Sequence, residues 1–303
     1  MRNAVKTFKP RHNIEKQTVL KTVEPTDLIT FLVGSMPDKS RKSILTLLTH
    51  QQVSVDHKIT TQYNHPLNAG QQVIINWNKV LQGSQHKGLK IVFEDASLVV
   101  VEKPHGLLSI ATDKEKDRTA YRILSDQAKK IHPKNLIFIV HRLDREVSGL
   151  MMFAKSRDIQ QKLQDAWDKD VVERKYVAVV EGIVKEDQST ITSWLNENKA
   201  RIMYSSYTPD DGQKAVTHYR VLKRGKNFSM LEVNLETGRK NQIRVHMKDI
   251  GHSIVGDVKY GANKKNLNRL GLHAFALAFR HPVTGENLRF ETHIPHNFLS
   301  LFK

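Results

Sequence analysis

The stretch His141-Arg142-Leu143-Asp144-Arg145-Glu146-Val147-Ser148-Gly149 says more about fold and function than any other part of the chain. It separates two apolar runs, residues 136–140 and 150–154, and it ends in glycine. Runs of this length and composition predict buried strands. The pattern therefore predicts a tight connection that presents one carboxylate, Asp144, between two strands. From the residues alone, an Asp–Arg pair that only stabilises a turn is the other interpretation.

The same stretch has the residue order of a known catalytic motif. His-Arg-Leu-Asp at residues 141–144, followed by Ser-Gly-Leu and an apolar strand, resembles the central motif of the RluA-type pseudouridine synthases. In that family the aspartate of the motif is catalytic, so the resemblance implies that Asp144 is the catalytic carboxylate. Arg142 beside it is expected to bind substrate. Val147 stands where the family often has threonine, which puts a local hydroxyl contact in doubt.

Further blocks in the family's order extend the resemblance. They are Glu102-Lys103-Pro104, a strand that begins Lys175-Tyr176, and a run from Thr237-Gly238-Arg239 through Gln242-Ile243-Arg244 to Gly256-Asp257. The resemblance implies that Tyr176 stacks on the target base and that Arg244 pairs with Asp144. Arg239 is a weaker candidate for that pairing and is expected to bind substrate.

Each of these residues also has a simpler interpretation. A tyrosine in a strand is commonly a half-buried core residue whose hydroxyl is hydrogen-bonded. Arg239 and Arg244 could equally be helix-end phosphate ligands or plain surface charges. Asn241 stands where the family commonly has histidine, which leaves the role of that side chain open.

The composition is that of a basic globular protein. The 303 residues include 48 Lys and Arg against 31 Asp and Glu, a formal net charge of +17. Such an excess favours a polyanionic partner, and without a lipid signal nucleic acid is a better match than a membrane. A generally basic, soluble surface is the alternative.

The absence of cysteine excludes disulfides and thiolate metal sites. No apolar run approaches the roughly 20 residues that span a bilayer, and residues 1–21 lack the apolar core of a secretion signal. A cytoplasmic monomer is therefore expected. The histidines lack close ligand spacing and no His-Glu-x-x-His helix occurs, so neither a metal nor another cofactor is expected.

The pattern along the chain predicts four segments. Residues 1–23 form a basic tail, 24–77 a small domain, 78–89 a polar linker and 90–303 the catalytic domain. Apolar spacing in the small domain indicates two helices and then strands. This order resembles the ribosomal-protein-type RNA-binding domain that often precedes this catalytic family. The start of its second helix carries Lys39, Arg41 and Lys42. These side chains are expected to contact phosphate, and a solvated helix end is the alternative.

The resemblance implies both a fold and a reaction. The expected fold is α+β, with a mixed, largely antiparallel central sheet, flanking helices and a small N-terminal α/β domain. The expected reaction is isomerisation of uridine to pseudouridine in structured RNA, with large-subunit ribosomal RNA as the first candidate and transfer RNA as the second. Whether Asp144 acts at the ribose or at the base is left open. A non-catalytic RNA-binding protein and a metal-dependent nuclease are the rival interpretations.

Overall fold

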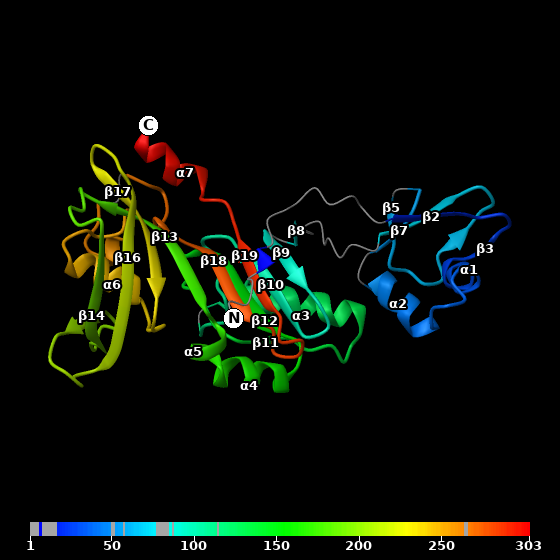
Figure 1. The fold of residues 1–303 in the computed structure, drawn as a ribbon, viewed down its shortest axis with the longest axis horizontal. Coiled ribbons are helices and arrows are strands. Elements are labelled where there is room, and N and C mark those ends of the chain that lie inside the picture. Colours follow the sequence, from blue (N-terminus) through cyan, green and yellow to red (C-terminus); the bar gives the residue numbers. More distant parts are fainter. Residues whose placement is uncertain are drawn as a thin grey trace. The chain divides into compact units, whose positions relative to one another are not determined.

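The computed structural model describes residues 6–7, 17–49, 52–56, 58–76, 85–86, 88–113, 115–263 and 266–303. By its internal contacts the chain divides into two units, one made of Met1–Lys9 with Gln85–Lys303 and the other of Pro10–Ser84. Each unit has its own sheet and its own hydrophobic core (Figure 1).

The smaller unit combines two helices with a sheet of four antiparallel strands. The strand order is β2 (Gln17–Lys21), β7 (Gln72–Asn76), β4 (Val53–Val55) and β5 (Lys58–Ile59), and β3 (Thr26–Asp27) pairs separately with β6 (Pro66–Leu67). Both expected helices are confirmed, as α1 (Leu28–Ser35) and α2 (Arg41–Thr49). Ser40 directly precedes α2, and its hydroxyl accepts a hydrogen bond from the Ser43 amide at 3.2 Å. The core includes Leu28, Leu32, Ile44, Leu48, Val53, Val73 and Ile75.

Two expected segment boundaries differ from the structure. Residues 17–21, expected within a basic tail, form strand β2, because Leu20 packs on the core of the small unit and the strand pairs with β7. Residues 6–7 form β1, while the rest of the tail before residue 17 lies outside the described residues. In the expected linker, residues 85–86 form β8 and residue 89 begins β9; residues 78–84 and 87 lie outside the described part.

The larger unit is built on one mixed sheet, which confirms the expected α+β fold. Its strands follow the order β15-β14-β16-β17-β13-β18-β12-β10-β9-β8, with β19 beside β18, β1 beside β19 and β11 beside β12. All neighbours are antiparallel except β12 with β18 and β1 with β19. The strands are β1 (Lys6–Thr7), β8 (Gln85–His86), β9 (Leu89–Glu94), β10 (Leu98–Lys103), β11 (Phe138–Ile139), β12 (Ser148–Ala154), β13 (Glu173–Glu181), β14 (Gln188–Glu197), β15 (Met203–Ser206), β16 (Gln213–Arg224), β17 (Phe228–Leu235), β18 (Leu272–Arg280) and β19 (Asn287–Glu291).

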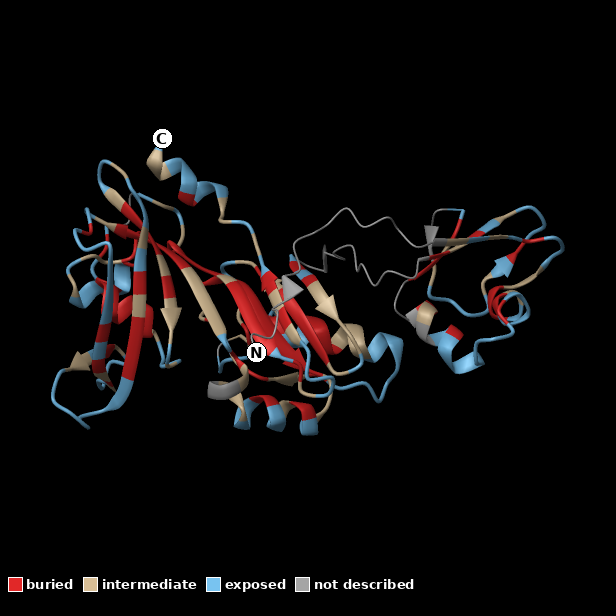
Figure 2. Ribbon diagram, viewed as in Figure 1, coloured by how far each residue is buried: buried red, intermediate tan, exposed pale blue. Residues whose placement is uncertain are grey.

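Short helices accompany this sheet. They are α3 (Ala120–Ile131), α4 (Arg157–Asp165), α5 (Trp167–Asp170), α6 (Gln242–Asp249), η1 (Val258–Tyr260), α7 (His296–Leu299) and η2 (Ser300–Phe302). Ser156 caps α4, and Ile159 and Leu163 on its inner face join the core cluster that also contains residues of β12. Figure 2 shows the result, with buried residues along the central strands and exposed residues on the outer face of α4. No helix in the described part of the chain is long and apolar enough to cross a membrane.

Strand β12 is the buried centre of the sheet, since all seven of its residues are buried. It runs antiparallel to β10, but at its start Ser148 and Gly149 pair in parallel with His273 and Ala274 of β18. Gly149 has φ +119°, and a Cβ there would collide with the Ala274 backbone. Only glycine therefore lets the two strands approach at this point.

The connection into β12 lies at residues 140–147, close to the expected position. Strand β11 is confined to residues 138–139, and it pairs with Phe153 and Ala154 at the far end of β12. The chain then turns at residues 144–147, where the Val147 amide donates to the Asp144 carbonyl at 3.2 Å, so residues 140–147 form a loop that contains the expected tight turn. Asp144 lies in this loop of residues 140–147, the catalytic-motif loop.

Helix α6 is fixed to the sheet by buried side-chain hydrogen bonds. The ring of His246 is completely buried, with Nδ1 2.8 Å from the Thr217 hydroxyl and Nε2 2.9 Å from the Ser193 hydroxyl. Gln242 donates to the Val216 carbonyl at 3.0 Å and to the Thr217 hydroxyl at 2.9 Å. Buried polar groups bonded on all sides define one orientation of a helix.

The buried ring predicts an acid-sensitive fold. Burial lowers the pKa of His246 to about 4. As pH falls from about 6.5 to about 4, His246 binds a proton in the unfolded chain but not in the folded chain. The free energy of unfolding therefore decreases, by roughly 3 kcal/mol at most for this group. We expect His246→Gln to flatten the pH dependence of urea unfolding between pH 7 and 4.5. The exposed control His293→Gln should keep the parental slope, and an unchanged slope in His246→Gln would contradict the assignment.

Candidate active site

The catalytic-motif loop is held from two sides. The Nε2 atom of His141 accepts a hydrogen bond from the Met152 amide at 3.1 Å, and its ring lies 5.0 Å from that of Trp167. Burial lowers the pKa of His141 to about 4, so the ring is neutral at pH 7. On the other side, the buried Ser109 hydroxyl donates to the Leu143 carbonyl (2.6 Å) and accepts from the Leu143 amide (3.1 Å). The residue before Asp144 is thus fixed at both of its backbone groups.

A buried lysine joins the block Glu102-Lys103-Pro104 to this loop. Lys103 is 0% exposed, and its ammonium group donates to the carbonyls of Pro104 (3.0 Å), Leu107 (2.7 Å) and Arg145 (3.4 Å). Burial lowers its pKa to about 7, against the opposing effect of nearby carboxylates. The Gly106 amide adds a bond to the Arg145 carbonyl at 2.7 Å. The turn after β10 and the loop of Asp144 therefore form one hydrogen-bonded unit.

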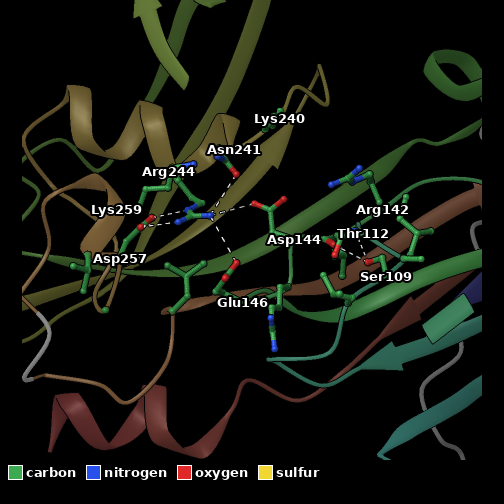
Figure 3. Close-up of a pocket in the computed structure, with 18 residues that line it drawn as sticks. Ser109, Thr112, Arg142, Asp144, Glu146, Lys240, Asn241, Arg244, Asp257 and Lys259 are labelled. Carbon is green, nitrogen blue, oxygen red and sulfur yellow. Dashed lines mark hydrogen bonds and ion pairs between the residues drawn. The ribbon is translucent and has the colours of Figure 1, made fainter. Parts of the chain in front are cut away.

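Arg244 connects helix α6 to the carboxylate of the motif. Its Nε and Nη2 atoms bind both oxygens of Asp257, at 2.7 and 2.8 Å, and its Nη1 atom lies 3.4 Å from Asp144 (Figure 3). Burial opposes the positive charge, but the hydrogen bonds and the charge of Asp257 outweigh it and raise the pKa of Arg244. The guanidinium also lies 5.0 Å from the centre of the Tyr260 ring. The arginine is a fixed cation that points one nitrogen at Asp144.

This geometry differs in one respect from the sequence-based expectation. Arg244 does contact Asp144, but its two-point partner is Asp257, which is 2% exposed. Sequence reasoning placed Asp257 at the end of the block that begins at Thr237 without giving it a role, and an acid directly after a glycine, Gly256, was the available signal. Asn241 also has a place: at φ 54° it precedes α6, donates to the Tyr260 hydroxyl at 3.0 Å and accepts from Arg244 Nη1 at 3.3 Å. Asparagine tolerates this left-handed conformation better than most residues.

Two cavities border Asp144. The smaller, of about 340 Å³, has mainly apolar walls that include Tyr176, Val147, Leu235 and Leu272, with Arg239 and Arg244 beside them. The larger, of about 460 Å³, is lined by residues 108–112, 142–146, 240–241, 244, 256–259 and 270. Asp144, Arg142, Lys240, Asn241 and Arg244 belong to both. The carboxylate therefore stands on the boundary between two spaces of a size that binds small organic groups.

Tyr176 lies in β13, between Val233 of β17 and Ala274 of β18. The tyrosine is partly exposed, and its side chain lines the smaller cavity. Burial raises the pKa of Tyr176 to about 12, with Arg174 opposing and Asp144 adding to the shift. At neutral pH the side chain is a neutral ring with a protonated hydroxyl, which suits stacking on a flat polar molecule.

The remaining sequence-predicted residues fall into two groups. Arg142 and Arg239 are exposed at the cavities, and Arg239 Nε donates to the Lys214 carbonyl at 3.0 Å. Lys39, Arg41 and Lys42 are exposed at the start of α2 in the smaller unit, where Lys39 lies 3.8 Å from Asp38. Within the described part of the chain, no group of three or more His, Asp or Glu side chains is arranged to hold a metal ion.

Comparisons with known proteins agree with the fold and the motifs. Residues 97–249 match the model of the RNA pseudouridylate synthase family. The chain is 34% identical over 282 residues to the uncharacterized RNA pseudouridine synthase YlyB of Bacillus subtilis, covering 90% of this chain and 92% of the relative. It is 36% identical over 232 residues to ribosomal large subunit pseudouridine synthase D of Zymomonas mobilis, covering 71% and 72% of the two chains.

A solved structure gives the same result in three dimensions. Human RNA pseudouridylate synthase domain containing 4 superposes with a TM-score of 0.58 and 25% sequence identity, over 70% of this chain and 90% of the human one. The resemblance of the ordered motifs, the mixed sheet and these similarities lead to one conclusion. The chain belongs to the RNA pseudouridylate synthase family and is an RNA pseudouridine synthase.

Proposed function

We propose that this enzyme converts uridine to pseudouridine in large-subunit ribosomal RNA, with transfer RNA as the second candidate substrate. The similarity to synthases named for the large ribosomal subunit in Zymomonas mobilis and Haemophilus influenzae supports the choice of RNA. The net charge of +17 supports a long polyanion. The observation that carries the proposal is the position of Asp144, aimed by Arg244 at the edge of a cavity that also contains Tyr176.

The proposed reaction assigns one task to each of these three residues. A base stacked in a helix is out of reach, so the target nucleotide is flipped out and its uracil enters the smaller cavity. The bond between N1 and the ribose breaks, the uracil turns, and C5 bonds to the same ribose carbon; C5 loses a proton and N1 gains one. Tyr176 stacks on the uracil throughout. Asp144 acts as an anionic group at the ribose or at the base, and Arg244 keeps it aimed.

Substrate binding is assigned to the exposed cations around this site. Arg142 and Arg239 are placed to contact phosphates that flank the flipped nucleotide, since both lie at the cavity that would hold the uracil. In the smaller unit, Lys39, Arg41 and Lys42 are proposed to bind more distant phosphates. The proposed division of labour is that residues 90–303 carry the chemistry and the smaller unit increases affinity for structured RNA.

Replacement of the carboxylate tests the catalytic assignment. Asp144→Asn keeps the side-chain size and removes the charge, so we expect uridine conversion to fall to background while RNA affinity changes little, because phosphate contacts supply most of it. Asp117→Asn, at an exposed position outside both cavities, is the control. Conversion is measured with a chelator present, as formation of pseudouridine without a change in the mass of the RNA. A metal-dependent nuclease would instead cleave the RNA, and it would do so only in the absence of the chelator. Comparable conversion by Asp144→Asn would remove Asp144 from the mechanism.

The pairing of Arg244 with Asp144 predicts unequal effects within one helix. Arg244→Lys and Arg244→Ala should greatly lower single-turnover conversion at saturating protein, with a modest loss of RNA affinity, because the remaining side chain cannot hold Asp257 and aim at Asp144 together. Arg244→Ala should also destabilise the fold by about 3–5 kcal/mol, since Asp257 is left buried without its cation. Lys248→Ala, exposed on the same helix, should mainly make affinity more salt-sensitive. Equal turnover losses would contradict the pairing.

Removal of the smaller unit tests the division of labour. A chain that begins at residue 85 should fold and convert uridine in a short RNA, but it should bind long RNA more weakly and modify it less selectively. Because β1 pairs with β19, a chain that lacks only residues 1–9 is the control for the loss of that strand. Failure of the residue-85 chain to fold, when the control folds, would show that the two parts depend on each other.

A further inference from the structure

The larger cavity has no task in the isomerisation of a single uridine. At about 460 Å³ it exceeds the cavity that contains Tyr176, and the two share Asp144 on their common boundary. If the uracil occupies the smaller cavity, as the proposed function requires, the larger one remains open beside it. Its volume is within the range of pockets that enclose small ligands.

The walls of the larger cavity combine apolar and cationic side chains. Leu108 and Ile110 are half-buried in the segment that follows β10, and Val258 in η1 is 59% exposed. An aliphatic side chain this exposed at a cavity offers a surface for the flat face of another group. Such apolar surfaces beside positive charge fit a nucleotide, whose base is flat and weakly polar and whose phosphate is an anion.

Two of the five cations at this cavity, which include Arg244, form no salt bridge in the described part of the chain. Lys240 pairs with Glu197 at 2.5 Å, and Arg145 lies 3.4 Å from Glu115. By contrast, Lys259 donates to the Arg201 carbonyl at 3.1 Å and lies near the Tyr260 ring, and Arg142 makes no hydrogen bond or ion pair to the described residues. Figure 3 shows Lys259 and Arg142 on opposite sides of Asp144.

We propose that the larger cavity binds the nucleotide adjacent to the target uridine in the same RNA strand. The neighbouring base lies against Ile110 and Val258, and the backbone phosphate beside it is held by Lys259. Extrusion of the target deprives its neighbour of a stacking partner, and the cavity replaces that contact. The substrate of this enzyme is then a stretch of two unstacked nucleotides, which favours loops over paired helices. This inference rests on the proposed function, because it requires the uracil to occupy the smaller cavity.

The test removes one base at a time from the RNA. Short hairpins with the target uridine carry an abasic ribose immediately 5′, immediately 3′, or five nucleotides away, and affinity and single-turnover conversion are measured for each. We expect one flanking abasic site to weaken binding roughly tenfold, the size of a lost stacking contact. The distant abasic site should have little effect. Equal effects at all three positions would overturn the subsite.

Protein variants connect that loss to this cavity. Val258→Ser and Lys259→Met should weaken binding of the intact hairpin but should add little to the loss that the flanking abasic site already causes. Val283→Ser, 62% exposed elsewhere, and Lys248→Met are matched controls whose effects should be the same on both RNAs. Additive losses for Val258→Ser and Lys259→Met would assign them a general electrostatic or structural role and overturn the proposal. Failure of the parent enzyme to convert the intact hairpin and longer RNAs would instead refute the proposed function itself.

Discussion

The ion pair between Arg244 and Asp257 is the interaction on which the active site depends. Both side chains are nearly excluded from solvent, and a buried charge is tolerated only with a well-oriented partner. Arg244 contacts Asp257 through its Nε and Nη2 atoms, which leaves its Nη1 atom for Asp144. The structure therefore gives the two carboxylates different surroundings, since Asp257 positions the arginine and Asp144, partly exposed, borders both cavities as its proposed catalytic role requires.

The surrounding architecture maintains this arrangement from several directions. Helix α6 carries Arg244 and is fixed to β14 and β16 by His246 and Gln242. The loop of Asp144 is held by Ser109, His141 and the buried Lys103. Each support uses hydrogen bonds that water cannot easily replace, so the carboxylate and the guanidinium meet without needing RNA to bring them together.

Sequence reasoning predicted the main parts of the site because they lie in contiguous motifs. It placed Asp144 and Arg244 in contact and put Tyr176 in the strand that borders the same cavity, which is where the structure has them. It missed the two-point bond to Asp257, because a choice between two carboxylates depends on where helix α6 and η1 cross in space. It predicted the turn before β12 correctly but made the preceding strand too long, at residues 136–140 where β11 has only 138–139, since residue types alone cannot show which residues pair with β12.

The parallel pairing of β12 with β18 has a consequence for how the enzyme is made. Ser148 bonds to His273, 125 positions later in the chain, and Asp144 meets Arg244 across 100 positions. Such distant contacts form slowly, because the entropy of closing a long loop is lost before any contact compensates for it. During synthesis, β12 can pair with β10 and β11 at once, but its start must wait for β18 to leave the ribosome before it gains the neighbour on its other side. The catalytic centre is among the last parts of the nascent chain to become ordered, so incomplete products released from the ribosome carry the motif without its activity.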